Sequence, residues 1–189
     1  MKLMVIDGNS ILNRAYYGIR PLTTRDGLYT HAVFGFFTTL LRLREEEQPD
    51  AVCVTFDVHA PTFRHTADAA YKATRKPMPE ELRPQLGLLR QALGEMGVAW
   101  TEAPGFEADD IIGTLSAQAE ERGLATVIVT GDRDSFQLIG GNTQVWFTKK
   151  GISETEKLDE AALRERYGLA PWQVPDLKGL MGDSSDNIP

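Results

Sequence analysis

Nine acidic residues occupy positions from which they could hold metal ions. Three of them, Asp7, Asp57 and Asp132, come at or near the ends of the three most apolar segments of the chain. The other six are grouped in the stretches PGFEADDIIGTL, GDRD and GDSSDN, which contain Glu107, Asp109, Asp110, Asp134, Asp183 and Asp186. Carboxylate oxygens without histidine or cysteine favour Mg²⁺, with Mn²⁺ as an alternative.

Nine carboxylates exceed what one ion needs. Two ions, about 3.5–4 Å apart, would account for the surplus and could stabilise both oxygens of a phosphoryl displacement. Glu107, Asp109 and Asp110 fall within four residues, and a helix N-terminus offsets only about 0.3–1 kcal/mol per charge. A cationic group is therefore expected beside them. Any single one of the nine could instead be a turn or capping residue, so the argument depends on their convergence.

A basic segment with aromatic residues, about residues 60–79, follows Asp57. Lysine and arginine neutralise phosphates, while aromatic rings stack on bases without reading sequence. The candidates for nucleic-acid binding are Arg64, Tyr71, Lys72, Arg75 and Lys76, together with Arg14 from the segment after the first apolar run. A solvated loop is the alternative for residues 60–79, and a surface helix position is the alternative for Arg14.

The net negative charge of the whole chain, taken alone, argues against nucleic-acid binding. The 189 residues include 20 basic and 27 acidic ones, a net charge of −7. Without the nine candidate ligands the balance is 20 against 18, or +2, so the acidity reflects the metal site more than the surface. The single cysteine, Cys53, excludes an intrachain disulfide, and no apolar stretch is long enough to span a membrane. We therefore expect a cytoplasmic protein.

Short apolar runs alternate with helical patterns along the chain. Residues 3–7, 51–57 and 125–132 are typical of strands buried on both faces. Apolar spacing predicts helices over about 33–41, 82–96 and 108–119. Weaker patterns predict strands at 98–102, 144–148 and 152–155 and helices at 159–167 and 171–181. This order indicates one α/β domain over residues 1–189, a mostly parallel doubly wound sheet flanked by helices.

The fold class explains how distant acidic residues could meet. In open α/β sheets the carboxyl ends of the strands line the ligand crevice. Asp7, Asp57 and Asp132 should therefore converge at one edge of the sheet, with residues 60–79 leaving the sheet beside them.

Several segments, in order and spacing, resemble a known family. VIDGNSILNRAYY, FDVHAPTFRH, PGFEADDIIGTL, TGDRDSFQL and GLMGDSSDNIP are similar to the 5′-nuclease (5′-3′ exonuclease) domains of bacterial DNA polymerases I, in the flap-endonuclease superfamily. The resemblance covers essentially the whole chain. It implies a resolvase-like or PIN-like core with a helical arch, and metal-dependent cleavage of DNA with a 5′ flap or nick and of RNA primers in RNA–DNA hybrids, leaving 5′-phosphates.

The resemblance also implies residue roles. The first metal site would use Asp7, Asp57, Glu107, Asp109 and Asp110, and the second would use Asp132, Asp134, Asp183 and Asp186. Lys72, Arg75 and Arg14 would act in catalysis by steadying the scissile phosphate, and Tyr71 would help to gather the 5′ strand. His31 and Thr66 depart from the family pattern at peripheral positions. The pattern continues past DNIP into a helix-hairpin-helix element that this chain does not include, so a longer polymerase chain is expected.

Two other functions remain open at this point. A phosphatase with Asp7 as nucleophile would need a carboxylate two residues later, where Asn9 stands. A noncatalytic metal- and DNA-binding fragment is the second alternative. Assays of flap cleavage with Mg²⁺ and with EDTA separate the fragment from a nuclease, because binding without cleavage supports the fragment. Turnover of a small phosphate ester with a trapped phosphoaspartate would support the phosphatase.

Overall fold

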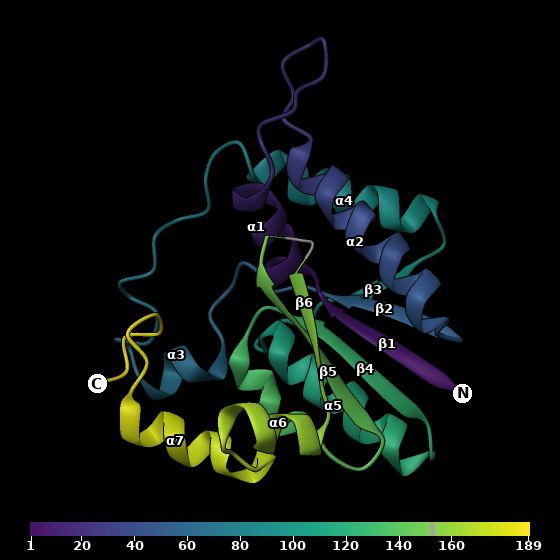
Figure 1. Cartoon of the computed structure of the whole chain (residues 1–189). Coiled ribbons are helices and arrows are strands. Elements are labelled where there is room, and N and C mark those ends of the chain that lie inside the picture. The colour runs from purple at the N-terminus through teal and green to yellow at the C-terminus, as the bar shows by residue number, and fades with distance from the viewer. Residues whose placement is uncertain (152–153) are drawn as a thin grey trace.

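The computed structural model describes residues 1–151 and 154–189, which form one six-stranded sheet with helices on both faces (Figure 1). The order is β3-β2-β1-β4-β5-β6, with β6 antiparallel to β5 and the other pairs parallel. The strands are β1 (Lys2–Asp7), β2 (Ala51–Thr55), β3 (Ala99–Thr101), β4 (Ala125–Thr130), β5 (Thr143–Lys150) and β6 (Glu154–Leu158). The mostly parallel α/β sheet predicted from the sequence is confirmed.

The helices divide between the two faces because the chain winds outward from β1 in two directions. The first half builds β1, β2 and β3, with α1, α2 and α4 together on one face, and the second half builds β4, β5 and β6 (Figure 1). The strand order therefore reverses between β1 and β4, where such sheets bind ligands. The α-helices are α1 (Gly8–Gly18), α2 (His31–Glu47), α3 (Phe63–Ala67), α4 (Arg83–Glu95), α5 (Ala108–Glu121), α6 (Glu160–Tyr167) and α7 (Val174–Met181).

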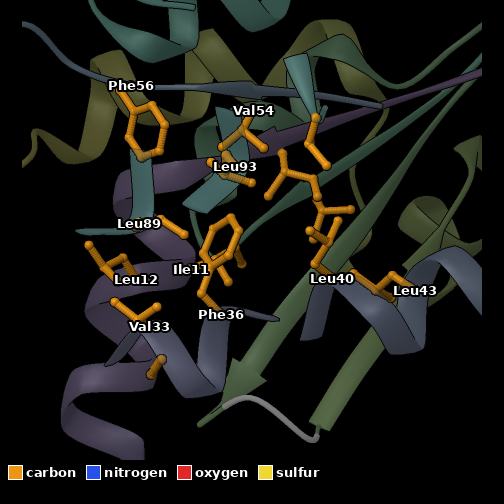
Figure 2. Packing of buried hydrophobic residues seen from close by; sticks show 14 of the residues in the cluster. Ile11, Leu12, Val33, Phe36, Leu40, Leu43, Val54, Phe56, Leu89 and Leu93 are labelled. Atoms are coloured by element: carbon orange, nitrogen blue, oxygen red, sulfur yellow. The ribbon is translucent and has the colours of Figure 1, made fainter. Parts of the chain in front are cut away.

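Alternation along β1 supplies both hydrophobic cores. Met4 and Ile6 point to the larger cluster with α1, α2 and α4, whereas Val5 points to the cluster with α5, α6 and α7. In the larger cluster Phe36 and Leu40 of α2 pack near Leu89 and Leu93 of α4 (Figure 2). Successive strand residues face opposite sides, so burial on both faces explains the continuous apolar runs.

Both the strong and the weaker sequence patterns correspond to real elements with shifted ends. β2 ends at Thr55 and β4 at Thr130, so Asp57 and Asp132 lie in the loops just beyond their strands. The pattern at 144–148 is part of β5, and the expected strand 152–155 overlaps β6 only at 154–155, since residues 152 and 153 lie outside the described residues. The expected helix 171–181 divides into the 3-10 helix η2 (Pro171–Gln173) and α7.

Residues 60–79 leave the sheet after β2, as expected. They contain α3 and a series of turns through Thr74, and Lys72 adopts a left-handed backbone conformation with φ of 57°. In the described residues, no helix combines the length and the apolar character needed to cross a bilayer. Cys53 is half-buried on β2 and is unpaired.

Candidate active site

A cavity of about 1180 Å³ opens at the carboxyl edge of the sheet. Its wall includes eight of the nine acidic candidates, all except Asp183, and it also includes the basic segment after Asp57. The acidic residues of the wall are Asp7, Asp57, Glu107, Asp109, Asp110, Asp132, Asp134 and Asp186, and the basic and aromatic candidates are Arg64, Tyr71, Lys72, Arg75 and Lys76. Segments far apart in the sequence therefore meet in one place.

Asp7 is the innermost of the strand-end carboxylates. It ends β1 and caps α1: its Oδ1 accepts from the backbone N–H of Ser10 at 2.9 Å, and its Oδ2 accepts from the Thr130 hydroxyl at 2.9 Å. Burial, with smaller repulsion from Asp57 and Asp132, outweighs these two hydrogen bonds and raises the pKa of Asp7 to about 6. The Asp7 carboxylate is thus held in place but destabilised as an anion.

Asp109 lies opposite, in the first turn of α5. Burial raises its pKa to about 8, with additional repulsion from Asp7, Asp132 and Asp57. Its buried Oδ1 has no hydrogen-bond partner among the described residues. Asp57 Oδ1 accepts from the N–H of Ala108 at 2.8 Å, which fixes the loop after β2 against the start of α5. With the more exposed Asp132 of the loop after β4, these side chains form an anionic group around the buried Asp7, hereafter the buried cluster (Asp7, Asp57, Asp109 and Asp132).

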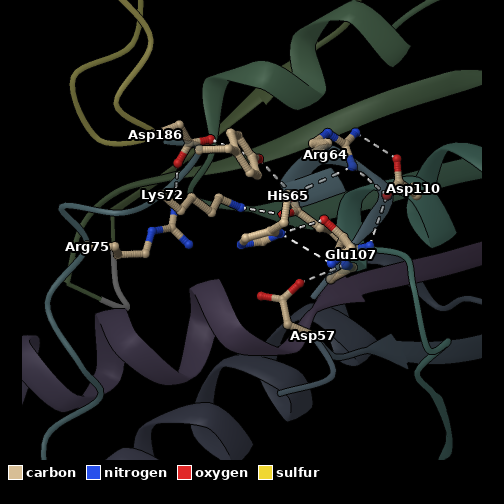
Figure 3. Close-up of polar contacts among 11 residues, drawn as sticks. Asp57, Arg64, His65, Lys72, Arg75, Glu107, Asp110 and Asp186 are labelled. Carbon is tan, nitrogen blue, oxygen red and sulfur yellow. Dashed lines mark hydrogen bonds and ion pairs between the residues drawn. The ribbon is translucent and has the colours of Figure 1, made fainter. Parts of the chain in front are cut away.

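The other two acidic residues near the start of α5 have the cationic neighbours that their spacing required. Arg64 of α3 makes a bidentate contact with Asp110 at 2.7 and 2.8 Å (Figure 3), and this contact holds the pKa of Asp110 below its usual value. Lys72 Nζ lies 2.8 Å from Glu107 Oε1. The capping Glu107 and the helix start are therefore neutralised from the basic segment.

The basic segment is also tied to the C-terminal turn. The N–H of Lys72 donates to the carbonyl of Asp186 at 2.9 Å, and the Asn187 amide donates to the carbonyl of Ala70 at 2.9 Å. Arg75 pairs with the Asp186 carboxylate at 3.0 Å, and the Tyr71 hydroxyl lies within 3.3 Å of it (Figure 3). Burial and the charges of Glu107 and Asp186 raise the pKa of Tyr71 well above its usual range, so its hydroxyl remains a donor.

A second group of carboxylates lies at the rim, hereafter the rim cluster (Asp134, Asp183 and Asp186). Lys178 of α7 bridges two of them, with Nζ 2.8 Å from Asp134 Oδ1 and 2.7 Å from Asp183 Oδ2. Burial opposes its charge, but the hydrogen bonds to both carboxylates outweigh burial and raise the pKa of Lys178. Lys178 and Ser185 together lower the pKa of Asp183.

Arg14 takes a different place from the other basic candidates. Its guanidinium donates to the carbonyls of Gly131 at 2.7 Å and Lys149 at 2.9 Å, behind the loop that carries Asp132. A Cβ at Gly131 would lie 1.7 Å from Arg14 Nε, so the loop passes close to the arginine only because residue 131 is glycine. Arg14 is not part of the cavity wall, whereas Lys76 is.

The donor atoms of these residues suit divalent cations, but the distances between the side chains do not yet match the coordination of an ion. The donors are all carboxylates, burial and, to a smaller extent, repulsion between carboxylates raise the pKa values of Asp7, Asp109 and Asp134, and Asp109 offers an unpartnered buried oxygen. Such a set favours a hard cation. Across residues 1–151 and 154–189, no three of the acidic, histidine or cysteine side chains are already spaced to hold one ion. Ligation therefore requires small side-chain movements.

Two functional neighbours were not predicted from the sequence. Thr130, the last residue of β4, accepts from the N–H of Asp132 at 3.0 Å and donates to Asp7. Lys178 connects α7 with the GDRD and GDSSDN loops. The only sequence signals were a hydroxyl residue directly before GD and a lysine five residues before Asp183, and both are common.

Comparison with known proteins gives consistent results. The family model described as 5′-3′ exonuclease, N-terminal resolvase-like domain, matches residues 2–168. DNA polymerase I of Bacillus caldotenax is 46% identical over 188 residues, covering 100% of this chain but 21% of that protein. The chain therefore spans about a fifth of this relative.

Solved structures share the fold. Phage T5 5′-exonuclease with bound zinc has a TM-score of 0.78 at 20% identity, covering 100% of this chain and 69% of that one. The T5 flap endonuclease in a pseudo-enzyme-product complex with DNA and metal ions has a TM-score of 0.75 at 18% identity, covering 99% and 68%.

Proposed function

The chain belongs to the family of 5′-3′ exonuclease N-terminal, resolvase-like domains, and from this we propose that it hydrolyses phosphodiester bonds near 5′ ends with two divalent metal ions. The substrates would be DNA with a 5′ flap or nick and RNA primers in RNA–DNA hybrids, and the products would carry 5′-phosphates. The observation that supports this most is the cavity itself, where eight carboxylates face a basic segment. The metal-bound and DNA-bound T5 structures agree with it.

The carboxylates divide into two sets of ligands in this proposal. The first ion would be held by Asp7, Asp57, Glu107, Asp109 and Asp110, and the second by Asp132, Asp134, Asp183 and Asp186. When bound, such ions lower the pKa of water and stabilise charge on a phosphoryl group. Mg²⁺ fits an all-oxygen donor set, and Mn²⁺ is the alternative.

The remaining residues of the cavity would position the nucleic acid. Lys72 and Arg75 would offset the charge on the nonbridging oxygens, and Lys76 and Arg64 would hold neighbouring phosphates. The Tyr71 ring would contact the 5′ strand. We propose that residues 60–79 arch over the cavity within one domain spanning residues 1–189. Because Lys72 now pairs with Glu107 at 2.8 Å, it must exchange that carboxylate for phosphate.

One observation favours a noncatalytic, binding-only role. In the part of the chain that the structure describes, no three potential ligands are spaced to bind an ion without movement. If that movement does not take place in a chain of this length, the cavity would still attract nucleic acid through its basic segment.

Cleavage of a fluorescent 5′-flap DNA in Mg²⁺ and in EDTA tests the proposal. We expect Mg²⁺-dependent release of the flap with a 5′-phosphate on the product, measured by gel electrophoresis and mass spectrometry. Flap binding without cleavage in Mg²⁺ or Mn²⁺ would support the binding-only role instead.

A further inference from the structure

Lys178 is the one basic side chain that bridges two carboxylates of the rim cluster in the described structure. It extends from α7, its side chain is 38% exposed, and its ammonium lies 2.8 Å from Asp134 and 2.7 Å from Asp183. Those carboxylates belong to separate segments, η1 (Arg133–Leu138) and the turn after α7. One ammonium therefore holds together two segments that would otherwise repel each other.

The buried cluster has no such contact. Among the side chains that the structure describes, no ion pair within 4.0 Å reaches Asp7, Asp57, Asp109 or Asp132. Asp183 is further fixed by Ser185, whose N–H and hydroxyl donate to its Oδ1 at 2.9 and 2.7 Å. The rim carboxylates are thus arranged around a positive charge that the protein itself provides.

We propose that Lys178 acts as an internal cation that occupies the second metal position and competes with the divalent ion for Asp134 and Asp183. This inference rests on the proposed two-ion function. A protonated amine has no lone pair to ligate a metal, so an ion that binds the same oxygens, Asp134 Oδ1 and Asp183 Oδ2, must displace it. The flexible, partly exposed lysine side chain can move into the cavity mouth, where a substrate phosphate would receive its charge.

Competition of this kind makes second-ion binding dependent on the substrate. With no phosphate nearby, the displaced ammonium loses two carboxylate partners and gains only water. With nucleic acid in the cavity, it gains a phosphate, so the second ion and the substrate bind cooperatively. By linkage, each raises the affinity of the other by the same factor.

The test is Mn²⁺ binding to the full chain, measured by isothermal titration calorimetry for the wild type, Lys178→Met and Lys178→Arg. We expect two ions in the wild type, and in Lys178→Met a weaker-binding ion held about tenfold tighter, within the usual range of coupling between two ligands. The tighter ion should be unchanged, and Lys178→Arg should resemble the wild type. Lys157→Met is the matched control, because Lys157 pairs with the remote Glu47 at 2.6 Å.

Thermal unfolding distinguishes competition from a purely structural contact. Lys178→Met should lower Tm in EDTA, and the difference should disappear in saturating Mn²⁺. Lys157→Met should lower Tm equally in both conditions.

A readout on the wild type keeps the proposal testable if Lys178→Met does not fold. The lysine side-chain NMR signal of Lys178 should shift with the second equivalent of Mg²⁺ and not with the first. An unshifted signal, or second-ion affinity that is unchanged or weaker in Lys178→Met, would overturn the inference while leaving the proposed function intact. Fewer than two ions in the wild type would overturn both.

Discussion

The buried and rim clusters place the same chemical group in opposite electrostatic settings. In the buried cluster, Asp7 and Asp109 have pKa values raised to about 6 and about 8, mainly by burial and also by neighbouring carboxylates. At the rim, Lys178 and Ser185 lower the pKa of Asp183, although burial still raises the pKa of Asp134 against its contact with Lys178. Neutral donors make the direct contacts to Asp7, whereas Lys178 and Arg75 form direct ion pairs with the rim carboxylates.

The difference indicates how the site gains affinity for ions. Buried charges without partners are costly, so an ion that binds the buried cluster relieves repulsion already present in the fold. An ion at the rim replaces a favourable contact instead. We therefore expect the first ion to bind more tightly than the second.

The largest effect is expected for Asp109→Asn, which tests the contrast between the buried and rim clusters. It should reduce Mg²⁺-dependent flap cleavage by more than the roughly 10–100-fold that loss of an outer-shell partner of a metal ligand costs. In EDTA at pH 8 it should raise Tm, because it removes a buried, unpartnered anion while keeping the shape of the side chain.

Asp183→Asn makes the same substitution in the rim cluster and is compared with Asp109→Asn in its effect on Tm. It should lower Tm in EDTA, because Lys178 and Ser185 lose a charged acceptor. A rise in Tm for Asp109→Asn together with a fall for Asp183→Asn supports the contrast between the two clusters. A fall in Tm for both variants would contradict it.

The pH dependence of stability gives a second, smaller effect. A carboxyl group whose folded-state pKa lies above its unfolded value keeps its proton in the folded state while the unfolded chain has released it. Stability in EDTA should therefore fall between about pH 4 and pH 8, by at most about 1.4 kcal/mol per pH unit for each retained proton. From pH 6 to pH 8 Asp109 should dominate, since its pKa is raised to about 8.

Urea unfolding at pH 6 and pH 8 measures this effect. Asp109→Asn should flatten the decline, and so should saturating Mg²⁺. Asp183→Asn should keep it, because the pKa of Asp183 lies below this window. An equal decline in both variants would remove Asp109 as its cause.

The sequence was sufficient to predict the sheet and to predict that the acidic residues lie close together at one edge of it. Apolar runs ending near Asp7, Asp57 and Asp132 predicted parallel strands, and parallel strands bring their carboxyl ends to one edge. The contacts that decide each pKa were not accessible in this way. Whether Lys178 reaches Asp134, or Arg14 faces backbone carbonyls rather than the cavity, depends on the path of segments more than 40 residues apart in sequence.

The smallest effect is expected for Arg75→Ala. The Arg75 side chain is 52% exposed, and its pair with Asp186 spans 3.0 Å. Exposed ion pairs contribute roughly 0–1 kcal/mol, so the free energy of unfolding should fall by less than about 1 kcal/mol in urea titrations. A loss of several kcal/mol would show that the rim depends on Arg75 as much as on Lys178.

The bonds joining Ala70 and Lys72 to Asn187 and Asp186 determine when the site can form. Tyr71 and Asp186 are 115 residues apart along the chain. During synthesis the sheet can assemble from earlier segments, but the basic segment gains its anchor only after Asp186 and Asn187 have left the ribosome. The cavity can therefore be completed only after the last strand of the sheet, β6, has been synthesised.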